Sequence, residues 1–141
     1  MRILFDTNIV LDVLLAREPH AFDAARLFSL VDEGRMDGLL CATTLTTIYY
    51  LAEKSVGRQQ AQRSIRELMA MFEVAPVGAR ELESALGLGF KDYEDAVVHE
   101  SARNAGAVGI VTRNVKDYRS AKLSIYSPKE LLGAVQSLEE E

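Results

Sequence analysis

Three aspartates stand at positions from which a fold could gather them around a metal ion. Asp6 follows one apolar run, Asp117 comes after a second, and Asp95 lies in the first turn of an expected helix. Carboxylates that converge on one crevice repel one another unless a cation joins them. Mg²⁺ takes one or two carboxylates together with waters and phosphate oxygens, and such an ion activates water for attack on a phosphodiester. These residues therefore predict metal-assisted hydrolysis of a phosphodiester.

Further polar residues accompany these aspartates in the sequence. Thr112 ends the second apolar run and Asn114 follows it, so both are expected at the carboxyl end of a strand. Asp92 precedes Asp95 by three residues, which is the spacing of a helix N-cap and its N3 position. Capping is likewise the alternative to metal binding for Asp6, which could cap a helix, and for Asp117, which could cap a short turn.

Apolar runs and helical patterns alternate along the chain, and the elements they predict must position the candidate residues. The short runs predict buried strands, and the segments between them carry apolar residues at helical spacing. This alternation indicates an α/β domain with a parallel sheet and right-handed crossovers. Ligands of such domains bind beyond the carboxyl ends of the strands. The expected strands are 3–5, 38–42, 72–77, 108–112 and 123–126, and the expected helices include 19–32, 58–71, 80–88, 92–105 and 128–135.

The same patterns predict several local details. The first helix carries an apolar stripe, and Asp12 is expected to face away from it. Pro19 is typical of a first helical turn, so the second helix is expected to begin there. Thr43 or Thr44 is expected to cap the third helix. Met69 is expected on the apolar face of the fourth helix.

Composition favours one soluble domain. The chain has 141 residues, 48% of them hydrophobic, and we expect a domain at 1–136 followed by a frayed acidic tail at 137–141. The single cysteine, Cys41, is expected to be buried, and it excludes an intrachain disulfide and a cysteine-based zinc site within one chain. No apolar run is long enough to span a membrane, and an acidic residue follows the N-terminus too closely for a signal peptide, so we expect a cytoplasmic protein.

His20 and His99 lack metal-ligand spacing and are expected at the surface or behind the site.

The order and spacing of these motifs resemble the PIN domain family, in particular its VapC-type bacterial toxins. The resemblance covers nearly the whole chain and implies a three-layer α/β/α sandwich around a five-stranded parallel sheet. It also implies an acidic pocket for Mg²⁺ or Mn²⁺, ribonuclease activity on single-stranded or structured RNA, and a homodimer neutralised by a small antitoxin protein. The residues that carry it are Asp6-Thr7-Asn8-Ile9-Val10-Leu11-Asp12, Asp95-Ala96, Thr112-Arg113-Asn114 and Asp117-Tyr118.

The resemblance assigns roles to the candidate residues. Asp6, Asp95 and Asp117 would hold the ion. Asn114, which stands where many members carry an acid, would position water or phosphate together with Thr112. A water polarised by the metal would then attack the phosphodiester.

One position departs from the family pattern. Members usually carry a glutamate at the start of the third helix, where this sequence has Thr47, which brings no charge. Glu53 lies about 240° further around an α-helix and is a poor substitute, so Asp92 or Glu94 would have to supply the missing carboxylate. Two functions therefore stay open: a divalent-metal-dependent endoribonuclease, and a PIN-like module that binds RNA or a protein partner without cleaving.

The charge balance bears on the choice of partner. A formal net charge of -5, from 21 acids and 16 bases, disfavours a nucleic-acid partner when it is taken alone. A cation in the acidic pocket would, however, cancel much of that excess where a phosphate approaches. Four bases also lie within ten residues beside the expected site, namely Arg113, Lys116, Arg119 and Lys122.

Overall fold

Five parallel strands form a single sheet in the order β3-β2-β1-β4-β5. The structure is a computed structural model and describes residues 1–140. The first strand of the chain lies at the centre, because it pairs in parallel with β2 on one side and with β4 on the other. The strands are β1 (Arg2–Phe5), β2 (Asp37–Cys41), β3 (Glu73–Ala75), β4 (Gly109–Val111) and β5 (Ser124–Tyr126).

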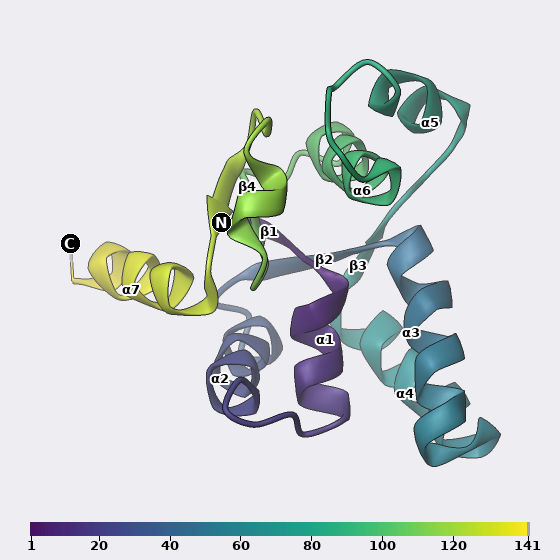
Figure 1. Ribbon diagram of the computed structural model, residues 1–141. Helices are drawn as coiled ribbons and strands as arrows, with labels where there is room; N and C mark the ends of the chain where they lie inside the picture. The colour runs from purple at the N-terminus through teal and green to yellow at the C-terminus, as the bar shows by residue number, and fades with distance from the viewer. Residues whose placement is uncertain (141) are drawn as a thin grey trace.

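Helices cover both faces of this sheet (Figure 1). They are α1 (Thr7–Leu14), α2 (Ala21–Asp32), α3 (Ala42–Val56), α4 (Arg58–Met71), α5 (Ala79–Ala85), α6 (Tyr93–Asn104) and α7 (Pro128–Glu139), and a 3-10 turn, η1 (Val115–Tyr118), follows β4. No helix within residues 1–140 is long and apolar enough to cross a membrane.

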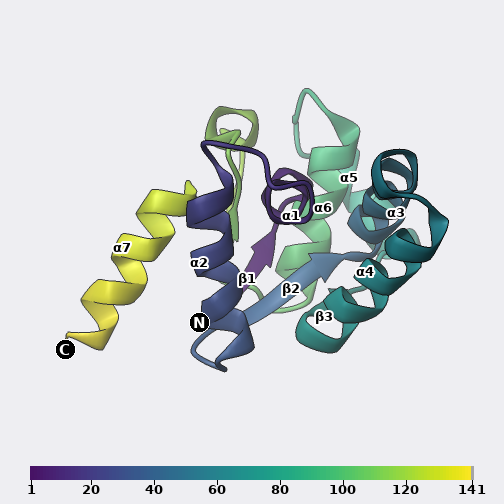
Figure 2. The ribbon, with the colours of Figure 1, turned by 90° about the horizontal axis from the view of Figure 1, so that it is seen from below.

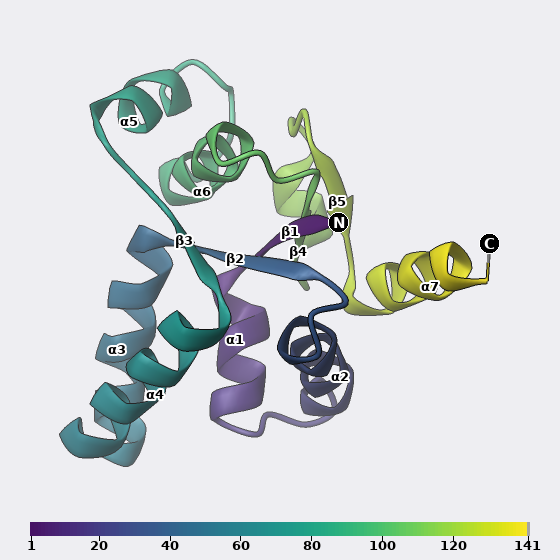
Figure 3. The same ribbon diagram turned by 180° about the vertical axis from the view of Figure 1, so that it is seen from behind.

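The helices divide into a larger and a smaller layer. The larger layer contains α1, α2, α3, α4 and α7, whose apolar side chains form one core cluster with the sheet. Figure 2 shows α1 and α2 in front of the sheet in the view onto this layer. On the opposite face α6 packs on the sheet and α5 packs on α6, as Figure 3 shows from behind. The expected three-layer α/β sandwich with a five-stranded parallel sheet is confirmed.

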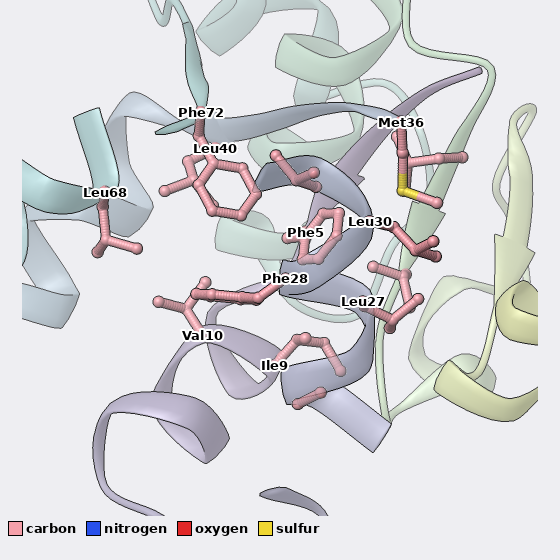
Figure 4. Close-up of a cluster of buried hydrophobic side chains, with 14 of the residues drawn as sticks. Phe5, Ile9, Val10, Leu27, Phe28, Leu30, Met36, Leu40, Leu68 and Phe72 are labelled. Atoms are coloured by element: carbon pink, nitrogen blue, oxygen red, sulfur yellow. The ribbon is translucent and has the colours of Figure 1, made fainter. Parts of the chain in front are cut away.

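An aromatic cluster lies in the core between the central strand and the larger helix layer. Phe5 of β1, Phe28 of α2 and Phe72, just before β3, pack edge to face with ring centroids 5.1 to 5.9 Å apart (Figure 4). Gly38 in β2 makes room for them, since a Cβ atom there would lie 2.6 Å from the Phe72 ring. Each such aromatic pair contributes about 0.5–1.5 kcal/mol beyond the burial of its area. The packing holds the end of β1 firmly, which matters because Asp6 is the next residue.

Three local predictions are wrong, each for a physical reason. Asp12 does not face solvent, because it is fully buried between two arginine side chains. The N-cap of α3 is Cys41, which offers no side-chain cap, and Thr44 is buried inside the first turn instead. Met69 is 56% exposed, and the smaller Ser64 takes the inward position on α4.

Two helix bounds also differ from expectation. α2 begins at Ala21, so Pro19 lies in the turn before the helix rather than in its first turn. α7 continues to Glu139, and residues 137–139 are therefore helical rather than frayed. The Glu139 carboxylate accepts hydrogen bonds from the Arg35 guanidinium, which fastens the end of α7 to the segment after α2. The last residue of the expected tail, 141, lies outside the described residues.

Candidate active site

Asp6 and Thr112 lie side by side at the carboxyl edge of the sheet. They follow β1 and β4, which are adjacent parallel strands, so both residues leave the sheet at the same edge. The Thr112 hydroxyl donates to Asp6 Oδ2 over 2.9 Å, and the Tyr118 hydroxyl donates to the same oxygen over 3.3 Å. Asp6 also caps α1, because its Oδ1 accepts from the backbone N–H of Thr7. Capping and a place in the site are therefore compatible for this residue.

Burial raises the pKa of the Asp6 carboxyl above its usual range. The hydrogen bonds from Thr112, Thr7 and Tyr118 act in the opposite direction, because they stabilise the charged form. The negative charge of Asp117 adds to the rise. An ionised Asp6 is thus well provided with hydrogen-bond donors, but its burial has the larger effect on its pKa.

Helix α6 brings Asp95 to the same edge of the sheet. Asp92 is its N-cap, as predicted, and the Asp92 Oδ1 accepts from the backbone N–H of Asp95 over 3.2 Å. The pKa of Asp95 is raised to about 7, first by burial and then by the charges of Asp6, Asp92, Asp117 and Glu94. Carboxylates from separate segments of the chain are therefore close enough to repel one another.

Two hollows meet along the wall formed by Asp92 and Asp95, which line both. The first measures about 320 Å³, and its lining also includes Asp6, Thr47 and Asn114. The second measures about 510 Å³, and its lining also includes Asp117, Lys91, Lys116 and Arg119. Thr112 is fully buried behind Asp6. The structure thus places Asp6, Asp95, Asp92 and Asn114 around one hollow and Asp117 in the adjoining one.

The donors of the first hollow suit a hard divalent cation, although they do not form a closed cage. Within residues 1–140, no three Asp, Glu, His or Cys side chains lie close enough together to hold an ion between them. Mg²⁺ keeps several of its waters and needs only one or two carboxylates. Asp6 and Asp95, which line the same hollow, meet that requirement. Thr47 lines this hollow too and adds a hydroxyl but no charge.

A buried carboxylate on α1 organises two arginines beside the acidic residues. Asp12 is fully buried, and its Oδ2 accepts from Arg113 Nε over 2.7 Å while its Oδ1 accepts from Arg17 Nε over 2.9 Å. Arg113 Nη2 donates to Oδ1 as well, over 3.2 Å. Both arginines line the first hollow together with Asp6. A charge as deeply buried as Asp12 requires such pairing.

Asn8 and Thr112 fasten the loop after β4 to the start of α1. Asn8 Nδ2 donates to the Thr112 hydroxyl over 3.3 Å, and Asn8 Oδ1 accepts from the backbone N–H of Arg113 over 3.1 Å. The Thr112 hydroxyl also accepts from the backbone N–H of Asn114 over 3.0 Å. The segment Thr112-Arg113-Asn114 is therefore fixed by hydrogen bonds to its own backbone and to α1.

A buried histidine joins α6 to the segment after η1. His99 is fully buried, and its Nε2 accepts from the backbone N–H of Lys122 over 3.0 Å. Its proton therefore lies on Nδ1, which donates to Glu100 Oε2 over 2.9 Å. Burial lowers the pKa of His99. Burial by itself would raise the pKa of Glu100, but hydrogen bonds and the charge of Arg103 lower it.

Sequence reasoning missed the roles of Asp12, Tyr118 and His99. Asp12 comes four residues after Asn8, the spacing of one helix face. Since Asn8 stands next to the site, that spacing was a usable signal for Asp12. The contacts of Tyr118 with Asp6 and of His99 with Lys122 join segments far apart in the sequence, for which no local pattern exists.

Comparison with known proteins gives consistent matches over most of the chain. The model of the PIN domain family matches residues 2–116. Ribonuclease VapC1 of Aquifex aeolicus (strain VF5) is 24% identical over 134 residues, which are 92% of each chain. A toxin–antitoxin complex from Klebsiella pneumoniae superposes with a TM-score of 0.69 at 20% identity, covering 89% of this chain and 97% of that one. VapC20 of Mycobacterium tuberculosis, described as a sarcin-ricin loop cleaving toxin, superposes with a TM-score of 0.62 at 16% identity, covering 77% and 86%.

Proposed function

The chain belongs to the PIN domain family, and we propose that it is a divalent-metal-dependent endoribonuclease, the toxin of a toxin–antitoxin pair. The observation that carries the nuclease is the crowding of Asp6 and Asp95 in one hollow, where the pKa of Asp95 is raised to about 7. Acids held in mutual repulsion at the end of a parallel sheet favour a cation between them. RNA is the proposed substrate, because the similar VapC1 of Aquifex aeolicus is a ribonuclease.

Asp6 and Asp95 would hold Mg²⁺ or Mn²⁺, with waters as the remaining ligands. When bound, the ion supplies a polarised water and offsets the charge that develops on the phosphate. The hydroxyls of Thr112 and Tyr118 fix the direction in which Asp6 presents its carboxylate. Asn114 lines the same hollow, and its side-chain amide would donate to a phosphate oxygen.

Asp92, which lines both hollows, and Asp117, which lines the second, would contribute through their charges. Both line the second hollow, and their charges raise the pKa of Asp95, so their field also attracts a cation. Lys91, Lys116 and Arg119 line that hollow as well and offer positive charge to the phosphates of a bound strand. In this proposal, the acidic groups attract the cation and the neighbouring basic groups attract the phosphates of the strand.

A small antitoxin protein and a second copy of the chain are the proposed protein partners. This proposal is supported by the structural likeness to the toxin–antitoxin complex from Klebsiella pneumoniae. The superposition covers 97% of the matched chain of that complex. Co-expression with the product of an adjacent small reading frame tests this partner. We expect a stable complex in which RNA cleavage is suppressed.

Thr47 favours a second candidate function, a module that binds RNA or a protein without cleaving. It lines the hollow that holds Asp6 and Asp95, where the family pattern would place a charged ligand. One experiment separates the two functions: single-stranded RNA is incubated with the purified protein and Mn²⁺, with and without chelator. We expect cleavage that chelator stops and that Asp6→Asn abolishes. If the protein binds RNA in the presence of chelator but never cleaves it, the binding module is favoured. If the Asp6→Asn variant still cleaves RNA, the metal mechanism is excluded.

A further inference from the structure

Arg17 and Arg113 form a cationic pair that the mechanism above does not use. Both share the fully buried carboxylate of Asp12, so the three side chains together carry one net positive charge. The side chain of Arg17 is 39% exposed and that of Arg113 is 28% exposed, whereas that of Asp12 is 1% exposed. The anchor is thus hidden while both guanidinium groups reach solvent.

The remaining donors of this pair are free to bind a ligand. Arg113 directs Nε and Nη2 to Asp12, and Arg17 directs Nε to Asp12 and Nη2 to the backbone carbonyl of Asn8. The other N–H groups of each guanidinium have no partner among the hydrogen bonds within residues 1–140. A planar fork of N–H donors held by a second group matches the oxygens of a phosphate.

Arg113 of this pair lies between the acidic hollow and a third hollow. Arg113 lines the hollow of Asp6 and Asp95 and also lines a hollow of about 470 Å³, whose other lining residues include Pro19, His20, Pro128 and Lys129. The His20 ring in that hollow offers a stacking surface and Lys129 offers positive charge, both of which proteins use to bind single strands. A strand that passes Asp6 and continues toward Pro19 would meet Arg17 in the acidic hollow and Arg113, which lines both hollows.

We propose that Arg17 and Arg113, positioned by Asp12, form a binding subsite for a backbone phosphate of single-stranded RNA next to the phosphate at Asp6. The inference rests on the proposed nuclease function, because it assigns the direction in which the substrate strand leaves the acidic hollow. Asp12 acts as a positioning residue, since it touches only the arginines. A structural ion pair alone would need neither two arginines nor the partial exposure of both in one hollow.

Metal-free binding provides the test. The protein in chelator is titrated with a fluorescent single-stranded 2′-O-methyl RNA at several NaCl concentrations, and the Kd is plotted against salt on logarithmic axes. Each phosphate contact to a single strand contributes about 0.7 to that slope. We expect Arg17→Gln and Arg113→Gln each to weaken binding several-fold and to reduce the slope by about 0.7. The matched control is Arg66→Gln, at an exposed position of α4, which should leave both quantities unchanged.

The outcomes separate the subsite from the nuclease. A wild-type slope in both arginine variants would overturn the subsite, even where the wild-type protein cleaves RNA. A reduced slope would support the subsite even where no cleavage is found. Thermal melting checks the fold of each variant. If Arg113→Gln does not fold, the salt slope of Arg17→Gln alone tests the subsite, since this variant keeps both hydrogen bonds from Arg113 to Asp12.

Discussion

The Thr112 hydroxyl lies 2.9 Å from Asp6 Oδ2, and through this one contact the end of β4 orients the carboxylate at the end of β1. The same hydroxyl accepts from Asn114 N and from Asn8 Nδ2. It is therefore the common partner of the site carboxylate and of the loop that follows β4. Replacing this single oxygen disturbs both.

We expect Thr112→Val to destabilise the protein by about 1–3 kcal/mol, because it keeps the shape but leaves buried polar groups without a partner. RNA cleavage should fall as well, since Asp6 loses a donor. Urea unfolding measures the first effect and a cleavage assay the second. The control is Thr46→Val, at an exposed threonine whose hydroxyl bonds only within its own helix. Equal stability of the two variants would contradict this role of Thr112.

Asp95 should make the stability of the metal-free protein fall as pH rises. Its pKa is about 7 in the folded chain and about 3.9 when unfolded. The folded state therefore binds more protons between these values, so the stabilisation is complete below about pH 4 and lost by about pH 7. We expect Asp95→Asn to raise the Tm at pH 8 in chelator and to change it little at pH 4. The exposed Glu67→Gln on α4 serves as the control, and a shift of equal size at both pH values would argue against the assignment.

Asp12→Asn should destabilise the chain by about 3 kcal/mol, since it removes the charge to which two arginines are bound and leaves them facing each other. The matched variant is Asp23→Asn, which removes a surface pair with Lys129 at 3.9 Å and should change stability by less than about 1 kcal/mol. Equilibrium unfolding in urea distinguishes the two. Similar values for both would show that the buried network contributes little.

Removal of the buried histidine should loosen the segment after η1. His99→Leu keeps the volume but withdraws the acceptor of the Lys122 N–H, so hydrogen exchange at Lys122 should become faster. Because burial lowers the pKa of His99, the unfolded chain takes up a proton first, and wild-type stability should fall as pH drops below about 6.5. That decline should be smaller in the variant. Unchanged exchange at Lys122 would rule out the proposed tie.

Thr47→Glu should restore a carboxylate to the hollow that holds Asp6 and Asp95. In chelator we expect a lower Tm than wild type, because one more negative charge joins the crowded acids. With Mn²⁺ we expect tighter metal binding by calorimetry and faster RNA cleavage. Thr46→Glu places the same charge on the exposed neighbouring position and should show neither gain. A Thr47→Glu protein with wild-type metal affinity would show that this position does not face the ion.

The fold was largely predictable from the sequence because its signals are local. Apolar runs of strand length alternate with helical patterns, and every strand of the sheet lies within or next to a predicted run. The predictions were wrong where a contact between distant segments of the chain overrode the preference of a residue for the surface or the core. Asp12 has the polarity of a surface residue, yet Arg17 and Arg113 approach it from elsewhere in the chain and permit its burial.

The site was predictable in part for the same reason. Parallel topology brings the carboxyl ends of β1 and β4 to one edge, so the proximity of Asp6 and Thr112 follows from the sequence pattern. Which donors reach Asp6 does not follow, since Tyr118 arrives through the path of η1. The hollow that Asp117 lines likewise depends on how that turn leaves the sheet.

The central place of β1 has a consequence for the synthesis of the protein. The strand is synthesised before its two neighbours, and one of them, β4, is made more than a hundred residues later. Thr112 and Tyr118, which orient Asp6, belong to that late part of the chain. A nascent chain therefore carries its first acid without the groups that orient it. The hydrogen bonds that orient Asp6 therefore form only after β4 and η1 have been synthesised and have packed beside β1.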